Sequence, residues 1–155
     1  MKKKYYIAYG SNMDIEQMAL RCPDAILIDT SEVHGYELLF KGSLTGAYAT
    51  IEANEGSIVP VLIWEISKAD EANLDRYEGY PTFYYKKELE VEVEGEKLQA
   101  MVYIMDEKRQ LGHPSNRYYR ILKLAYERFG FDLSILKSAL KKSILKGGQS
   151  IEFWS

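Results

Sequence analysis

Two segments that lie far apart in the chain carry the residue types that a catalytic site would need. The first, Tyr9-Gly10-Ser11-Asn12, follows an apolar stretch near the N-terminus and precedes a predicted helix. Glycine lets backbone approach a ligand closely, and N–H groups ahead of a helix can hold a carboxylate or a developing oxyanion. The second segment places a carboxylate, Glu78, directly before Gly79 and close to Pro81. A donor-rich loop and one carboxylate suffice for acid–base chemistry without a metal or a covalent intermediate.

The loop also has a purely structural explanation. Ser11 and Asn12 are good helix N-caps, and Asp14 and Glu16 suit the first turn of a helix. The same residues therefore fit either a ligand-binding loop or a capped strand-to-helix turn.

Glu78 likewise has two explanations. A glutamate at the end of a helix is ordinarily a surface residue. This one, however, stands among aromatic residues that could partly desolvate it and raise its pKa toward the range of a general base. Those residues are Tyr77, Tyr80, Phe83, Tyr84 and Tyr85.

A third segment, His113-Pro114-Ser115-Asn116-Arg117-Tyr118, begins another predicted helix. Ser115 is a suitable N-cap after Pro114. Tyr118 then falls in the first turn, from which its hydroxyl could point into a pocket.

Composition excludes several classes of function. With 20 basic and 23 acidic residues the net charge is −3, which favours neither nucleic acid nor an anionic membrane as a partner. We expect no metal site, because the candidate ligands His34, His113 and Cys22 are few and scattered. The sequence also contains no phosphate-binding P-loop pattern. A single cysteine excludes an internal disulfide framework and favours a cytoplasmic location. The thirteen tyrosines suit a β-rich fold and a cavity with hydroxyl groups.

Apolar periodicity and turn residues predict the elements that must position these side chains. Strands are expected over residues 4–9, 25–28, 33–41, 47–53, 58–66, 84–94 and 97–105, with a bend at Gly35 and turns at 54–56 and 94–96. Helices are expected over residues 14–21, 68–77, 115–129 and 133–146.

Hairpin connections without regular alternation of strands and helices favour an α+β fold, a small and mostly antiparallel β-barrel or sheet with flanking helices. We expect one domain over residues 1–146 and a C-terminal tail over 147–155. The apolar residues 151–154 of that tail could support a homodimer, or Trp154 could fold back on its own core.

Taken together, these segments resemble the gamma-glutamylcyclotransferase-like (AIG2-like) family. The resemblance spans roughly residues 4–140, and each motif is weak alone while the ordered set is fairly specific. The matching motifs are Tyr9-Gly10-Ser11-Asn12, Ala49-Thr50-Ile51, Leu74-Asp75-Arg76-Tyr77-Glu78-Gly79, Tyr84 with Lys86-Lys87, Tyr103-Ile104-Met105 and Pro114-Ser115-Asn116-Arg117-Tyr118.

The resemblance implies a small β-barrel-like α+β fold with one cavity and no cofactor. It implies that Glu78 is the acid/base carboxylate, that the Tyr9-Gly10-Ser11-Asn12 loop binds the γ-glutamyl group, and that Tyr118 contacts the substrate. This chain departs from the family at Tyr77 and Tyr80-Pro81 and in the short segment 41–47, which shape the wall facing the leaving group.

The implied reaction converts an L-γ-glutamyl amine or amide to 5-oxoproline and releases the free amine. Three alternatives stay open at this point. The γ-glutamyl group could be carried on a polyamine-like amine, or it could protect a biosynthetic intermediate bound to an acyl carrier. The chain could also be a non-catalytic module that binds a small carboxylate.

Overall fold

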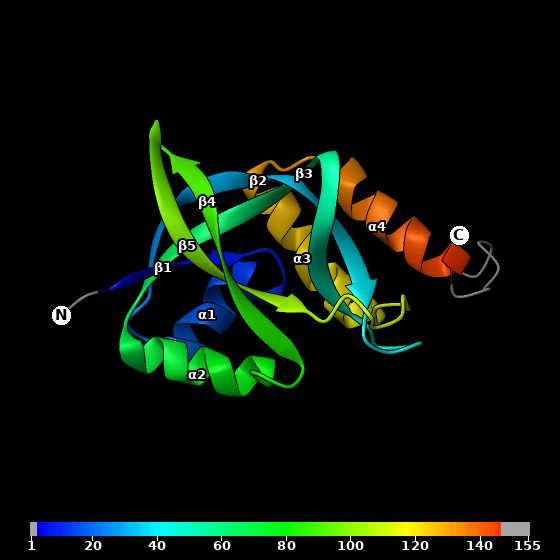
Figure 1. Cartoon of the computed structure of the whole chain (residues 1–155), viewed down its shortest axis with the longest axis horizontal. Coiled ribbons are helices and arrows are strands. Elements are labelled where there is room, and N and C mark those ends of the chain that lie inside the picture. Colours follow the sequence, from blue (N-terminus) through cyan, green and yellow to red (C-terminus); the bar gives the residue numbers. More distant parts are fainter. Residues whose placement is uncertain (1–2, 147–155) are drawn as a thin grey trace.

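The computed structural model describes residues 3–146, which form one five-stranded sheet and four α-helices (Figure 1). The predicted tail and its homodimer contact lie outside the described residues. The elements are β1 (Lys4–Ala8), a 3-10 helix η1 (Ser11–Met13), α1 (Ile15–Arg21), β2 (Ile26–Lys41), β3 (Tyr48–Ile66), α2 (Lys68–Glu78), β4 (Tyr84–Val93), β5 (Glu96–Met105), α3 (Asn116–Phe129) and α4 (Leu133–Lys146).

The strand order is β2-β3-β1-β5-β4, and every neighbouring pair is antiparallel except β1 and β5. The parallel pair, which aligns Tyr6 with Met101, brings the carboxyl ends of β1 and β5 to the same edge of the sheet. The two outer strands curl toward each other, since Ser31 Oγ on β2 donates to the Glu92 carbonyl on β4 at 2.7 Å. They do not pair through backbone, so the α+β prediction is confirmed in its open-sheet form rather than as a closed barrel.

Four predicted strands merge into the two long strands β2 and β3. The turn predicted at residues 54–56 is wrong, because these residues form a bulge inside β3: His34 pairs with Ile58 and Tyr36 with Ala53. Gly35 (φ 79°) stands opposite this bulge, in a backbone conformation that suits glycine. Polar residues and glycine ordinarily indicate a turn. In this chain they form a bulge that bends the continuous β2–β3 pairing.

The hairpin between β4 and β5 is confirmed. Glu94 (φ 51°) and Gly95 (φ 81°) form the two-residue connection, and both take the positive φ that such tight turns require. The glutamates of β4 point to solvent while Val91 and Val93 are buried, which is the predicted alternation of a strand with one wet face.

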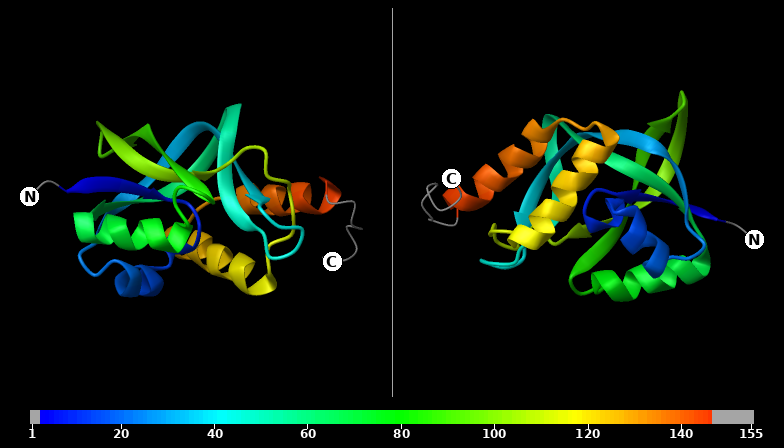
Figure 2. Two further views of the ribbon diagram at one scale, coloured as in Figure 1. Left: turned by 60° about the horizontal axis from the view of Figure 1, so that its bottom comes forward. Right: turned by 180° about the vertical axis from the view of Figure 1, so that it is seen from behind.

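The helices begin at polar caps. The side chain of Asp14 caps α1 by accepting from the N–H groups of Glu16 and Gln17 at 3.0 and 3.2 Å, so Asp14 rather than Ser11 or Asn12 is the N-cap. In the left view of Figure 2, the strands lie above α1, α2 and α3. Within residues 3–146, no helix has the length and apolar character needed to span a membrane.

Candidate active site

A small inner pocket lies where the carboxyl ends of β1 and β5, the end of α2 and the first turn of α3 meet. All six residues predicted to form a site line this pocket: Tyr9, Gly10, Ser11, Asn12, Glu78 and Tyr118. The rest of the lining comes from Tyr6, Ile7, Ala49, Tyr84 and Tyr103. The structure therefore brings the loop and the carboxylate into one cavity.

A larger outer pocket continues from the inner one, because Ser11, Glu78, Tyr84 and Tyr118 line both. The inner pocket has a volume of about 20 Å³ and the outer pocket a volume of about 310 Å³. The inner space suits one small polar group, since a single water molecule needs about 10–15 Å³ of such a cavity. The outer pocket has room for the rest of a small molecule.

Glu78 is the last residue of α2, and Gly79 (φ 67°) ends the helix in the left-handed conformation directly after it. Glu78 is half-buried. Burial raises the pKa of Glu78 from its usual 4.5 to about 7, and the nearby Arg21 guanidinium only partly opposes this rise. The negative end of the α2 dipole also disfavours the ionised form. A carboxyl group with such a pKa can both accept and return a proton near neutral pH.

The Ser11 side chain belongs to the boundary between the two pockets. Ser11 Oγ and Tyr77 Oη share a hydrogen bond of 3.1 Å, which links the loop to the last turn of α2. The η1 helix has no side-chain cap. The capped-turn explanation of this loop therefore fails for Ser11, whose hydroxyl faces the site.

Asn12 is 3% exposed and holds the loop in place. Its side-chain amide donates to Tyr6 Oη at 2.8 Å and accepts a hydrogen bond from Arg21 Nη1. The backbone carbonyl of Asn12 accepts a hydrogen bond from Trp64 Nε1 at 3.2 Å. The hydrogen bonds to Tyr6 and Arg21 occupy the side-chain amide of Asn12. Asn12 therefore supports ligand binding by fixing the loop backbone and not by contacting the ligand with its side chain.

Gly10 leaves room for its neighbours. A Cβ at this position would lie 3.1 Å from Tyr118 Oη and 3.6 Å from the Cβ of Ala49. The glycine thus allows the loop backbone to approach the tyrosine hydroxyl. Because the first N–H groups of a helix have no acceptor within it, the donors at the start of η1 suit an anionic ligand.

Tyr118 projects from the first turn of α3, which Ser115 caps by accepting from Tyr118 N at 3.1 Å. The Tyr118 hydroxyl accepts a hydrogen bond from the Ala49 N–H at 3.1 Å. A hydroxyl that accepts one bond still has a proton to donate. Burial raises the pKa of Tyr118 well above its usual value, so this group stays a neutral donor.

Other tyrosines of the inner pocket bond to the backbone or to a carboxylate. Tyr9 Oη donates to the Tyr103 carbonyl at 2.6 Å and so joins the ends of β1 and β5. Tyr84 Oη donates to the Ala49 carbonyl at 2.8 Å. Tyr103 Oη donates to Asp75 Oδ1 at 2.6 Å. These bonds fix the positions of the rings around Glu78.

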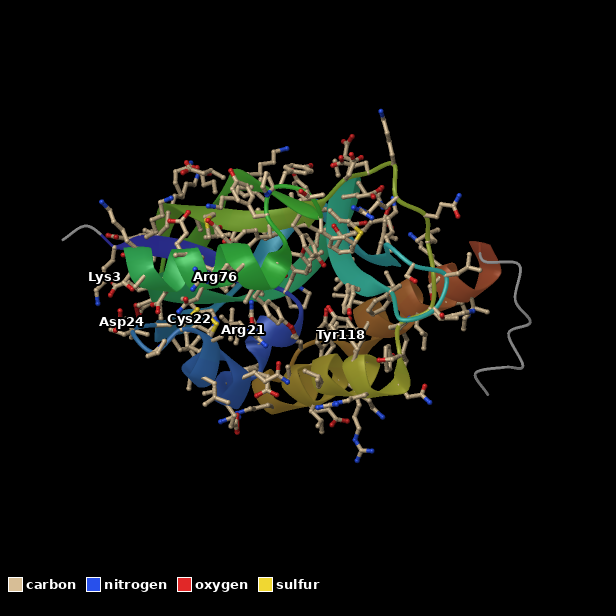
Figure 3. The ribbon with its side chains drawn as sticks, turned by 90° about the horizontal axis from the view of Figure 1, so that it is seen from below. Lys3, Arg21, Cys22, Asp24, Arg76 and Tyr118 are labelled. Carbon is tan, nitrogen blue, oxygen red and sulfur yellow. The ribbon has the colours of Figure 1, made fainter. Side chains whose placement is uncertain are left out.

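Arg21 is a residue that sequence analysis missed. Its guanidinium carbon lies 3.5 Å above the centre of the Tyr77 ring, and its Nη1 donates to Asn12. Figure 3 labels Arg21 at the end of α1, between α1 and α2. An arginine in the last turn of a helix ordinarily lies in solvent, so the sequence carried no signal for this contact.

Within residues 3–146, no group of three or more histidine, cysteine or acidic side chains is arranged to hold a metal ion. Cys22 is 1% exposed and belongs to the hydrophobic core. Burial raises the pKa of its thiol to about 12, which makes it unsuited to act as a nucleophile.

Comparisons with known proteins give the family and the fold. The sequence profile of the family described as "Gamma-glutamyl cyclotransferase, AIG2-like" matches residues 6–122, which include every residue that lines the two pockets. A relative from Bos taurus named gamma-glutamylcyclotransferase is 29% identical over 159 residues, which cover 95% of this chain and 84% of the relative. A relative of the same name from Homo sapiens is 30% identical over 138 residues, which cover 83% of this chain and 72% of the relative. A solved structure titled "Gamma-glutamyl cyclotransferase" superposes with a TM-score of 0.79 at 25% identity and covers 89% of this chain and 86% of that one.

Proposed function

Because the chain belongs to the gamma-glutamyl cyclotransferase, AIG2-like family of enzymes, we propose that it cyclises an L-γ-glutamyl amine or amide to 5-oxoproline and releases the free amine. The observation that carries this proposal is the position of Glu78. It is a half-buried carboxyl group with a pKa raised to about 7, at the junction of an inner pocket and a larger outer one.

Cyclisation is an intramolecular reaction. The α-amino nitrogen of the substrate attacks its own γ-carbonyl carbon, a C–N bond forms to close the five-membered ring, and the original amide C–N bond breaks. The main task of the protein is to hold a folded substrate conformer, which can lower the barrier by several kcal/mol. The rings that surround Glu78 are fixed by their hydroxyl bonds and suit that task.

Glu78 is the proton shuttle in this proposal. The α-amino group of the substrate is an ammonium at neutral pH and must lose a proton before it can attack. The Glu78 carboxylate accepts that proton and passes it to the leaving nitrogen. It then accepts the second proton, which the attacking nitrogen loses on becoming the lactam N–H, and this proton leaves with the released amine as its ammonium form. A pKa near 7 supports both steps, because neither protonation state is strongly disfavoured.

Charge develops on the carbonyl oxygen during attack. We assign its stabilisation to the N–H groups at Gly10 and Ser11, which belong to residues of the inner pocket, and we assign the Tyr118 hydroxyl of the same pocket to binding the substrate. A donor of this kind contributes about 3–4 kcal/mol when it is preorganised and shielded from water. The small inner pocket favours such shielding.

Incubation with a panel of γ-glutamyl amino acids and γ-glutamyl amines, followed by detection of 5-oxoproline, tests the proposal. Release of 5-oxoproline together with an equal amount of free amine is the expected result. Thermal stabilisation by these compounds with no turnover would instead favour the non-catalytic binding module.

A further inference from the structure

A continuous series of aromatic rings forms the wall of the outer pocket. The ring of Tyr118 packs edge-on against Tyr48 at 5.3 Å between centroids, and Tyr48 packs against Phe83 at 6.2 Å. Phe83 in turn packs against Tyr84 at 5.2 Å. All four rings line the outer pocket, so a ligand in it would meet aromatic edges and faces on one side.

Two of the lining tyrosines are unusually exposed for large aromatic residues. Tyr48 and Tyr77 each keep 47% of their surface open to solvent. Both line the outer pocket, on different elements. Exposed aromatic surface gathered in a hollow marks a binding site more often than an isolated exposed residue does.

Arg76 adds a positive charge to this pocket. It lies on the last turn of α2, where Figure 3 labels it. It also lines the outer pocket. Its Nη2 donates to the neutral amide of Asn73. Among the side chains of residues 3–144, none supplies a carboxylate within 4.0 Å of the Arg76 guanidinium. This guanidinium can therefore pair with an anionic group of a ligand.

We propose that the outer pocket binds a leaving amine that is an aromatic α-amino acid, whose carboxylate pairs with Arg76 and whose ring packs against Tyr48 and Phe83. This inference rests on the proposed function and specifies its substrate class. Glu78 lies at the junction of the two pockets, so the scissile amide is placed there, with its carbonyl oxygen directed into the inner pocket and the leaving amine directed into the outer pocket.

The same charge disfavours the polyamine-like alternative. Aromatic faces attract cations, so the rings alone would also accept a second ammonium group. Arg76 lines the same pocket and repels such a group, whereas it attracts a carboxylate. The pocket thus distinguishes amino acids from cationic amines by charge and large side chains from small ones by ring contact.

Four compounds separate these contributions. γ-Glutamylphenylalanine carries both the ring and the carboxylate, γ-glutamylphenethylamine lacks the carboxylate, γ-glutamylalanine lacks the ring, and γ-glutamylputrescine carries a second cation. For the wild-type enzyme, kcat/KM measured by 5-oxoproline release should be about tenfold higher for the first compound than for each of the others.

Substitution of Arg76 tests the charge contact. Arg76→Met keeps much of the aliphatic stem and should bring the kcat/KM ratio of γ-glutamylphenylalanine to γ-glutamylphenethylamine close to one, whereas Arg76→Lys should retain part of it. Arg120→Met, an exposed arginine on α3 that lines neither pocket, should keep the wild-type ratio. An unchanged ratio in Arg76→Met would overturn the role of Arg76.

Substitution of Tyr48 tests the ring contact. Tyr48→Ala should lower the kcat/KM ratio of γ-glutamylphenylalanine to γ-glutamylalanine severalfold, because it removes a ring that packs between Tyr118 and Phe83. A wild-type preference for γ-glutamylalanine over γ-glutamylphenylalanine would overturn the aromatic part of the proposal.

Calorimetric titration of the Glu78→Gln variant with the same four compounds distinguishes this inference from the proposed function. Selective binding of γ-glutamylphenylalanine, without 5-oxoproline release by the wild-type enzyme, would support the outer-pocket assignment and contradict the cyclisation. Turnover of all four compounds at similar kcat/KM would support the cyclisation and contradict the outer-pocket assignment.

Discussion

The raised pKa of Glu78 predicts that this residue lowers the stability of the fold at neutral and alkaline pH. In the unfolded chain its carboxyl group titrates near 4.5, and in the folded protein near 7. Between these values the folded state binds the extra proton, so the free energy of unfolding falls as pH rises. This loss of free energy of unfolding is absent below about pH 4.5 and fully present above about pH 7, where it amounts to roughly 3 kcal/mol.

Glu78→Gln removes this titration while keeping the size of the side chain. The free energy of unfolding of the variant, relative to that of the wild type, should therefore increase by about 3 kcal/mol between pH 4.5 and pH 8. This corresponds to a relative rise of several degrees in Tm for a chain of this length, at about 2–4 °C per kcal/mol. Urea denaturation of both proteins at a series of pH values measures the difference directly.

Glu71→Gln is the matched control on the same helix. Burial alone would raise the pKa of Glu71, but hydrogen bonds from Lys86 and Lys4 outweigh it and lower the pKa. Glu71 therefore stabilises the fold above its unfolded pKa, and this contribution is lost as pH falls through the lowered folded value. The variant should be less stable than the wild type at pH 8, and the deficit should shrink in acid. If both variants showed the same pH trend, the reasoning about Glu78 would be refuted.

Three further predictions concern activity. The pH profile of kcat/KM should rise about tenfold per pH unit below pH 7 and level off above it, because the reaction needs the ionised form of Glu78; an inflection below pH 5 would contradict the assignment. Tyr118→Phe should raise KM about tenfold by removing one donor and leaving the Ala49 N–H without its acceptor; an unchanged KM would remove Tyr118 from the site. Asn12→Ala should lower kcat/KM at least tenfold and lower the free energy of unfolding by about 2 kcal/mol, since it breaks the bonds to Tyr6 and Arg21; wild-type values for both quantities would show that the loop holds its position without Asn12.

Much of the fold followed from periodicity and caps. The alternation of glutamate and aliphatic residues in β4, the Glu94-Gly95 hairpin and the Ser115 cap of α3 are local features that sequence specifies. The merging of four predicted strands into β2 and β3 was not predictable, because a bulge and a turn use the same residues. Only the long-range pairing of Tyr36 with Ala53 decides between them.

The candidate site divides in a similar way. The family resemblance carried by the ordered motifs implied one cavity for Glu78, the loop at Gly10 and Tyr118, and the structure brings them into one pocket. Sequence could not show that Arg21 stacks on Tyr77, because this contact depends on how α1 packs beside α2. The local aromatic segment also explained only part of the burial of Glu78, since Tyr6, Tyr9 and Tyr118 come from distant elements.

The most direct test of the central claim compares 5-oxoproline release by the wild-type enzyme and by Glu78→Gln under the same conditions, with γ-glutamylphenylalanine as substrate. The variant keeps the shape of the side chain and loses the ability to accept a proton. We predict a fall in kcat of at least a hundredfold, in line with the usual contribution of a general acid–base group, while calorimetry still detects binding. Release of 5-oxoproline by the variant at a rate near that of the wild type would contradict the assignment of Glu78 as the proton shuttle.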